Sequence, residues 1–304
     1  MKSFVLFLLC PFFLISQNYI QEFDSLFEAK NYDQAVQKLE IYTSKTPQDL
    51  ELLELMGDAY GFQSNWAKAV SCYKELLDFD PKNVTYHYKY GGVLGKLAKE
   101  EQKLSGISQI SKVKASFLTA AKLDPTHVNV RWALVELYTQ LPGFLGGSYK
   151  KAEVYANELE QLSESNGYFS KAYIFENSDK EELAKAYYKK GLNTLDELEC
   201  LQSELSHSTH LKLHTNSLHF LIATACVVNE EQFAIGQRYI QSYIDIISSK
   251  DSQPLEVAYV LQAQLFKLQK KIPEAISSID KALLLKPDFA AALKEQQLIL
   301  LLKP

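Results

Sequence analysis

Histidines gather in one short stretch of the second half of the chain, at His207, His210, His214 and His219. The first three follow the spacing i, i+3 and i+7, which would place their side chains on one helical face. Together with Glu204, these imidazoles could bind a zinc-like ion. The competing interpretation is a solvated connector, because a histidine-rich tract is only a compositional signal and neither H-E-x-x-H nor C-x-x-C accompanies it. Metal binding through the His207–His219 cluster is therefore an alternative, and our leading expectation includes no metal.

The sequence matches one catalytic motif in residue type and spacing alone. Ser148-x-x-Lys151 has the spacing of a β-lactamase-type nucleophile motif, but the S-D-N and K-T-G elements that should accompany it are absent. Neither G-x-S-x-G, nor a P-loop, nor a dinucleotide fingerprint occurs. We therefore expect a protein that is not an enzyme, with no catalytic residue and no cofactor.

A glycine-rich loop, residues 141–148, has the sequence LPGFLGGS and precedes a helix-forming segment. Free amides at the start of a helix favour negative charge, so such a loop could form an anion nest. The other interpretation is a wide turn in which Ser148 caps the following helix. No further element of a phosphate site is present, and this favours the turn.

A helical hairpin must position any functional residue, and its sequence pattern is clearest in residues 50–83. Two amphipathic segments are joined there by a polar turn and closed by Asp80-Pro81. Small residues let two helices approach closely, aromatic residues fill the adjoining space, and proline ends the second helix. These positions are Gly57, Tyr60, Ala69, Tyr73 and Pro81.

Counted from Leu50, these residues fall at positions 8, 11, 20, 24 and 32. The segment therefore resembles the tetratricopeptide repeat, whose 34-residue pattern is W-x2-L-G-x2-Y, then A-x3-F, then P. The resemblance implies stacked helical hairpins that bury one another's apolar faces. No stretch alternates apolar and polar residues as a half-buried strand requires. The expected fold is all-α, a right-handed α-solenoid of about seven such hairpins with a C-terminal capping helix.

The other repeats are less regular. The third carries an insertion around residues 100–113, which predicts two lengthened helices meeting at Ser105-Gly106. In the first, Asp33 is the expected N-cap of the second helix. The register of the sixth is uncertain. The expected units are 17–50, 50–83, 84–127, 128–164, 165–198, one from about Ser217, and 255–290, with a capping helix at 289–302.

The first 16 residues read as a signal peptide. Lys2 precedes an unbroken apolar run of 12 residues, Phe4 to Ile15, which is too short to span a bilayer. Cleavage after Ser16 would leave a mature chain without a transmembrane segment, exported to the periplasm or envelope. Lipidation at Cys10 and a cytoplasmic location are the alternatives. The expected division is signal peptide 1–16, N-terminal repeats 17–198, connector 199–216, and C-terminal repeats with the capping helix 217–304.

Composition narrows the choice of partner. The chain has 304 residues, is 47% hydrophobic, and carries a net charge of −5 without a block of like charge. Binding to nucleic acid requires a basic stripe, so nucleic acid is not an expected partner.

The resemblance also implies a binding groove. In this family, positions 2, 5, 9, 12 and 13 of each first helix line the concave side. Carried over, they give Glu54, Asp58 and Phe62 in the second repeat, Tyr88 and Lys96 in the third, Trp132 and Glu136 in the fourth, and Phe169 and Tyr173 in the fifth. The aromatic residues would anchor a partner, although aromatic residues at helical spacing also pack between helices.

Taken together, these patterns favour a non-catalytic scaffold that binds a protein or peptide in the groove of the solenoid. The acidic groove residues Glu54, Asp58 and Glu136 favour a basic partner. A second hypothesis is a periplasmic small-ligand-binding accessory protein of a transporter, which predicts a closed apolar pocket. The third is the metal-binding protein described above.

Overall fold

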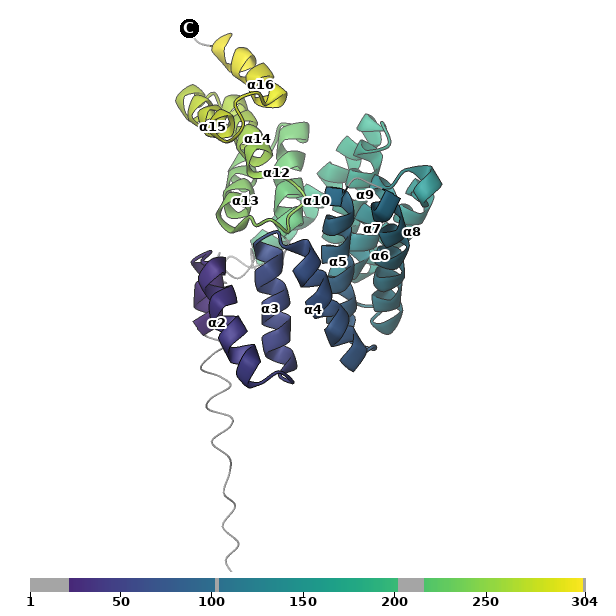
Figure 1. Ribbon diagram of the computed structural model, residues 1–304. Helices are drawn as coiled ribbons and strands as arrows, with labels where there is room; N and C mark the ends of the chain where they lie inside the picture. Colours follow the sequence, from purple (N-terminus) through teal and green to yellow (C-terminus); the bar gives the residue numbers. More distant parts are fainter. Residues whose placement is uncertain (1–21, 102–103, 202–215, 303–304) are drawn as a thin grey trace, which may run out of the picture. The chain divides into compact units, whose positions relative to one another are not determined.

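The computed structural model describes residues 22–101, 104–201 and 216–302, and every regular element in them is helical (Figure 1). The chain divides into two compact units, Met1–Lys82 and Asn83–Pro304, and each is described by itself. In the described parts of the chain, no helix is long and apolar enough to cross a membrane.

The first unit contains two hairpins. Residues 22–28 pair with α2 (Tyr32–Lys45), and α3 (Leu50–Phe62) pairs with α4 (Trp66–Phe79). The expected N-cap of α2 was wrong, because the side chain of Asn31 accepts the capping hydrogen bond from the backbone of Gln34. Asp33 lies in the first turn of α2 instead, and its carboxylate accepts a hydrogen bond from Nε2 of Gln63 at 2.6 Å.

Contact between a small residue and an aromatic ring closes the second hairpin, as the repeat pattern predicted. A Cβ atom on Gly57 would lie 2.8 Å from Cζ of Tyr73, and Ala69 is fully buried beside them. The third hairpin repeats the arrangement, since a Cβ atom on Gly91 would lie 2.7 Å from Cε1 of Phe117. Glycine is required at both positions because the facing ring occupies the space.

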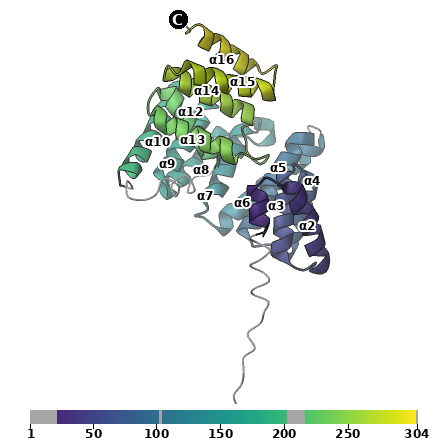
Figure 2. The same cartoon turned by 90° about the vertical axis from the view of Figure 1, so that its left-hand side faces the viewer.

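The second unit by itself contains five hairpins and a final helix, as far as its residues are described (Figures 1 and 2). Sequence neighbours pack as antiparallel pairs, and α16 packs on α14 and α15. The helices are α5 (Val84–Glu101), α6 (Leu104–Leu123), α7 (Val128–Gln140), α8 (Tyr149–Leu162), α9 (Glu164–Glu176), α10 (Glu181–Leu201), α12 (Asn216–Asn229), α13 (Phe233–Ile246), α14 (Leu255–Leu268), α15 (Ile272–Leu285) and α16 (Ala290–Leu300), with a short 3-10 helix η1 (Gly143–Leu145). The chain is thus an all-α helical-repeat solenoid.

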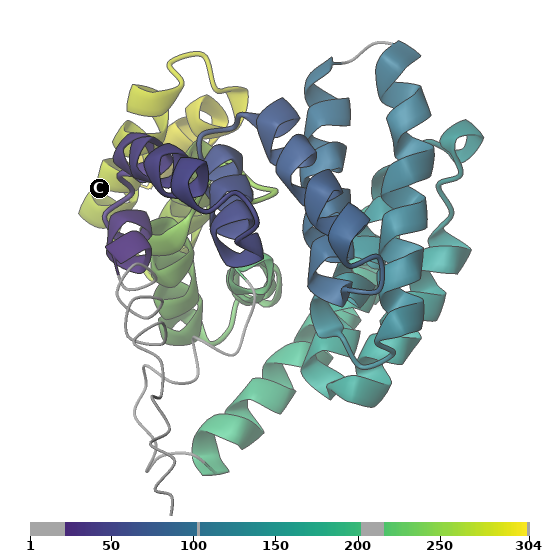
Figure 3. The same cartoon turned by 60° about the horizontal axis from the view of Figure 1, so that its bottom comes forward.

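The insertion in the third repeat lengthens both helices. Helix α5 has 18 residues and α6 has 20, and the two lie side by side (Figure 3). The expected junction at Ser105-Gly106 was wrong, because α6 already begins at Leu104. Amide groups in a first turn have no partner within the helix, so serine and glycine are tolerated there.

Five of the described hairpin turns use non-glycine residues in the left-handed region. The residues are Lys30, Ser64, Asp179, Glu230 with Gln232, and Lys270, with φ of 53°, 59°, 58°, 54°, 52° and 61°. At the second hairpin, the amide of Ser64 donates to the carbonyl of Gly61, and the next amide donates to Tyr60. These two bonds are those of a Schellman motif, which satisfies the last carbonyls of the first helix.

The capping helix agrees closely with its expected range of 289–302. Helix α16 buries Ala292 and Ile299 against the last hairpin. It also buries Glu295, whose Oε1 lies 2.5 Å from Nζ of Lys267 in α14. Because this ion pair is the polar interaction in an otherwise apolar contact, we expect it to favour one specific position of α16 on α14.

Most of the expected connector, 199–216, lies outside the described residues, as does the expected signal peptide. Helix α10 continues to Leu201, and α12 begins at Asn216. The division of the chain at this connector therefore stays a prediction.

Candidate functional site

Three of the nine predicted groove residues lie in the first unit. The carboxylate of Asp58 accepts a hydrogen bond from the hydroxyl of Tyr73 at 2.8 Å. The ring of Phe62 stacks on Tyr32, with centroids 4.8 Å apart and planes 9° from parallel. Asp58 and Phe62 therefore hold helices of the first unit together. Glu54 is partly buried on the same helix, α3.

Two predicted partner anchors, Trp132 and Phe169, are core residues. Only 6% of Trp132 is exposed, and its Nε1 donates to Oδ1 of Asn166 in the next first helix at 2.7 Å. Phe169 is fully buried, with its ring 6.4 Å from that of Tyr188. The expectation that these two rings anchor a partner was therefore wrong, because this position of the first helix packs against the neighbouring helix.

The remaining four predicted residues come together on three successive first helices. Tyr88 and Lys96 lie on α5, Glu136 on α7 and Tyr173 on α9, and all four are partly buried. The charge of Glu136 acts on the other three: it favours the charged form of Lys96 and disfavours ionisation of both tyrosines. We call Tyr88, Lys96, Glu136 and Tyr173 the polar wall.

Tyr173 is oriented by a neighbour from the preceding repeat. Nε2 of Gln140, at the end of α7, donates to the Tyr173 hydroxyl at 2.6 Å and to Oδ1 of Asn177 at 3.2 Å. Asn177 in turn donates through Nδ2 to the backbone carbonyl of Tyr173 at 2.8 Å. The two bonds of Gln140 join α7 to the end of α9 at one edge of the polar wall, and the third bond fixes Asn177 on α9.

A segment that the sequence did not single out lies against the polar wall. It is the α13–α14 loop, residues 247–254. Nζ of Lys96 donates to the backbone carbonyls of Ser249 at 3.2 Å and Asp251 at 2.6 Å. The hydroxyl of Tyr243 donates to the carbonyl of Gln253 at 2.5 Å. The register of the sixth repeat was uncertain, but Ser248-x-x-Asp251 followed by Pro254 is a turn signature that could have marked the loop.

Burial dominates the electrostatics of this region. It raises the pKa of the Glu136 carboxyl to about 7, with a contribution from Asp251 and an opposing one from Lys96. Burial also lowers the pKa of Lys96, and raises that of Tyr88 to about 12. The charges of Asp251 and Glu136 favour the charged form of Lys96, whereas the charge of Lys99 opposes it. Chemically, the polar wall can accept hydrogen bonds from a cationic group, and its tyrosines can donate or accept them.

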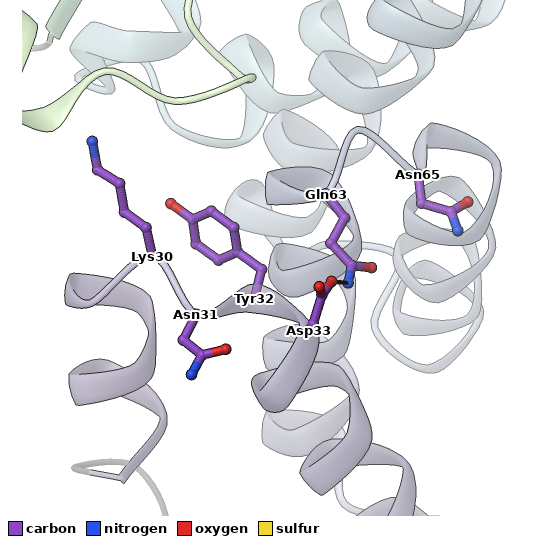
Figure 4. Close-up of a pocket in the computed structure, with 6 residues that line it drawn as sticks. All are labelled: Lys30, Asn31, Tyr32, Asp33, Gln63 and Asn65. Carbon is purple, nitrogen blue, oxygen red and sulfur yellow. Dashed lines mark hydrogen bonds between the residues drawn. The ribbon is translucent and has the colours of Figure 1, made fainter.

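A hollow lies in the first unit, where the turns of its two hairpins meet (Figure 4). Its volume is about 430 Å³, and its lining is polar: Lys30, Asn31, Tyr32, Asp33, Gln63 and Asn65. The side chains of Lys30, Asn31 and Asp33 are exposed to solvent. This hollow is therefore not the closed apolar pocket that the small-ligand hypothesis predicted.

The histidine cluster lies mainly outside the described residues, which include only His219 of its four members. His219 is 1% exposed, with Nδ1 3.3 Å from Oγ of Ser242 and its ring packed edge-on against Tyr239. Its contacts are those of a core residue. Within the described ranges, no three histidine, cysteine or acidic residues are grouped so as to hold a metal ion.

The glycine-rich loop before α8 is a wide turn. Oγ of Ser148 accepts a hydrogen bond from the amide of Lys151, which makes it the N-cap that the sequence favoured. Gly146 has φ of 94°, a conformation that side chains other than hydrogen rarely adopt. The amides of Gly146 and Gly147 bond back to carbonyls at the start of the loop. These amides satisfy the turn itself, so they leave no basis for an anion nest.

Comparison with known proteins identifies the repeat. Residues 165–193 match the family model of the tetratricopeptide repeat, and the match begins at Ser165, where the fifth repeat was expected to begin. None of the curated proteins matches the chain.

Two solved structures share the fold. A tetratricopeptide repeat protein from Parabacteroides merdae is 15% identical, with a TM-score of 0.53 over 93% of this chain and 98% of that one. The Cut9–Hcn1 hetero-tetramer of the APC/C is 14% identical, with a TM-score of 0.55 over 91% of this chain and 48% of that one. This chain therefore spans about half of the latter. The chain contains a tetratricopeptide repeat at residues 165–193 and has the fold of a tetratricopeptide repeat protein.

Proposed function

We propose that this chain is a non-catalytic scaffold that binds a protein or peptide segment along the polar wall. The observation that carries the proposal is the convergence of Tyr88, Lys96, Glu136 and Tyr173 from three successive first helices. First-helix positions form the binding side in proteins that resemble this repeat. A chain whose repeats place polar and aromatic side chains there has a surface suited to another polypeptide.

The chemistry of the wall supports a basic partner. The charges of Glu136 and Asp251 both favour the charged form of Lys96, so a lysine or arginine of the partner placed beside these two carboxyl groups would be favoured in the same way. The two tyrosines supply area and hydroxyl groups beside that charge, which suits an interface contact. Complementary charge would mainly accelerate association and select the partner.

Structural neighbours are consistent with a role in assembly. One of the two described above is solved as a hetero-tetramer of Cut9 with Hcn1. From that structure we carry over to this chain only the assembly of a helical-repeat protein with another chain.

Photo-crosslinking tests the proposal. A photoreactive benzoyl-phenylalanine replaces Tyr173 on the polar wall, and in a matched control it replaces Leu183, which is 46% exposed on second helix α10. Irradiation of cells that produce each variant should yield a defined adduct from position 173 and none from 183. The adduct should disappear when Glu136→Lys is added, because the reversed charge repels a basic partner.

Either of two results would contradict the proposal: adducts at both positions to the same extent, or an adduct at 183 alone. A catalytic turnover abolished by one point substitution would contradict the non-catalytic part.

We also propose that the chain is exported. The support is the sequence of residues 1–16, a lysine followed by an apolar run that is too short to span a bilayer. N-terminal sequencing of the protein from the producing cells should find a mature chain that begins near Gln17. An intact Met1 on protein from the cell envelope would refute cleavage and favour an anchor.

A further inference from the structure

Three backbone carbonyls of the α13–α14 loop point to side-chain donors. Those of Ser249 and Asp251 accept from Lys96, and that of Gln253 accepts from Tyr243. The three belong to alternate residues. Donors that bind these backbone carbonyls recognise the main chain of the loop, because every residue carries such an acceptor.

The loop is organised before it reaches the wall. Oδ2 of Asp251 accepts from the amide of Ser248 at 2.7 Å and from its hydroxyl at 3.1 Å, and the amide of Asp251 donates to the carbonyl of Ser248 at 3.2 Å. Side-chain bonds of this kind stabilise a turn locally. The loop therefore presents its carbonyls as a pre-formed turn, which reduces the entropy lost when it docks.

Lys96 is well placed to act as the receptor of this turn. It is partly buried on α5, its ammonium donates to the loop carbonyls, and the charge of Glu136 on α7 favours its charged form. A lysine that has lost part of its hydration recovers its hydrogen bonds from whichever acceptor reaches it. The contact spans 155 residues of sequence, so it is a tertiary docking contact and not a local turn.

We propose that the surface around Lys96 is a binding site for a peptide turn that presents backbone carbonyls, and that the α13–α14 loop is its resident ligand. This inference rests on the proposed function, because it assigns the ligand class of the same wall. An external segment binds by displacing the loop and offering the same carbonyls to Lys96. A turn stabilised by its own serine and aspartate, as in the loop, is the chemistry that fits.

The first test needs no partner. Hydrogen exchange followed by mass spectrometry is measured on the peptide that covers the loop in Lys96→Met, with Lys99→Met as the matched control. Lys99 is exposed near the end of the same helix. Exchange of the loop amides should be at least tenfold faster in Lys96→Met than in the control, relative to amides of α14 and α15. Equal exchange in the two variants would overturn the docking of the loop by Lys96.

The second test supplies the ligand separately. Residues 248–253 are replaced by a glycine–serine linker of equal length, which removes the resident turn. A capped, fluorescently labelled synthetic peptide of residues 247–254 is then titrated, and its anisotropy is measured. It should bind the linker variant at least tenfold more tightly than the wild type, and at least tenfold more tightly than the linker variant that also carries Lys96→Met.

The outcomes separate this inference from the proposed function. If the peptide binds the linker variant equally well with and without Lys96→Met, the inference is overturned. The proposal that the polar wall binds a peptide would still stand. The absence of peptide binding to either linker variant would also overturn the inference, whereas the cross-link from position 173 decides the proposed function independently. Circular dichroism of each variant shows whether the fold is retained, and the exchange result stands without any peptide.

Discussion

The indole N–H of Trp132 donates a hydrogen bond to Oδ1 of Asn166 at 2.7 Å, which joins α7 to the first turn of α9. Asn166 is itself held by Ser163, the N-cap residue of α9, whose Oγ accepts from Nδ2 at 3.0 Å. The ring of Trp132 is thus part of the packing between two successive hairpins, with its one polar atom satisfied.

Replacing this ring should destabilise the fold. Trp132→Ala is expected to lower the free energy of unfolding by about 3–5 kcal/mol, because it leaves a cavity between α7 and α9. Trp132→Phe should cost less, since it retains much of the volume and loses chiefly the hydrogen bond, worth about 1–2 kcal/mol. Urea unfolding followed by circular dichroism measures both. An unchanged midpoint for Trp132→Ala would contradict the core assignment.

The repeat fold was predictable because its main constraint is short in sequence. Gly57 and Tyr73 are 16 residues apart and meet within one hairpin, so the residue types at fixed spacing already encode the contact. The same holds for Ala69, which is fully buried where a small residue was expected. Even the divergent third repeat kept this relationship through Gly91 and Phe117.

The candidate site was predictable only in part. The resemblance to the tetratricopeptide repeat assigned Lys96 and Glu136 to the binding side. It could not distinguish them from Trp132, whose side chain packs against the next hairpin. The Lys96–Asp251 contact spans 155 residues and depends on how the intervening repeats stack. No periodicity within a single repeat contains that information, and the α13–α14 loop was therefore missed.

Substitution of the hairpin glycine tests the repeat packing. Gly57→Ala should lower the free energy of unfolding by about 1–3 kcal/mol from overpacking, because the new Cβ would lie 2.8 Å from Cζ of Tyr73. The ring cannot retreat easily, since its hydroxyl is bonded to Asp58. The matched control is Gly92→Ala, where nothing lies within 4 Å of the added atom.

The control should behave in the opposite way. Gly92 lies in the interior of α5, where alanine is favoured over glycine by about 0.5–1 kcal/mol. Differential scanning calorimetry of the two variants should therefore show one lowered and one raised melting temperature. Similar shifts in the two would be inconsistent with a close contact at Gly57.

The last hairpin turn carries backbone strain that glycine would relieve. Lys270 has φ of 61°, whereas the next residue, Lys271, has φ of −87° as the N-cap position of α15. A side chain in the left-handed region costs about 1–2 kcal/mol relative to the right-handed one. Lys270→Gly is therefore expected to raise the free energy of unfolding by about 1 kcal/mol, net of the extra freedom of the unfolded chain.

Chemical denaturation decides this prediction, with Lys271→Gly as the control. Both variants remove one lysine, so the change in net charge is the same. Lys271→Gly gains nothing from the left-handed region and should be neutral or destabilising. A loss of stability in Lys270→Gly would show that the lysine side chain contributes more than the strained backbone costs.

Five groups act on the Glu136 carboxyl or respond to it: Lys96 and Tyr88 on α5, Asp251 in the α13–α14 loop, Tyr173 on α9 and Tyr243 on α13. Burial of Glu136 has the largest effect on the pKa of this carboxyl, and the charge of Lys96 opposes that effect. The pKa of Glu136 rises from 4.5 to about 7 in the folded chain. The folded protein thus holds a proton here that the unfolded chain releases at a lower pH.

This difference has a defined sign. Its contribution to stability is fully present below the unfolded pKa, about 4.5, and is lost as the pH rises through about 7. Glu136→Gln keeps the shape and removes the titration, so its stability relative to the wild type should increase between pH 5 and pH 8, by on the order of 1–3 kcal/mol. Urea midpoints at the two pH values measure the change. Glu182→Gln, on the exposed face of α10, is the control. A different result is that Glu136→Gln loses stability relative to the wild type at pH 8. The ionised carboxylate would then interact with Lys96 strongly enough to outweigh the cost of its burial. Glu136 would in that case be a structural partner of Lys96 and would not be available to a basic ligand.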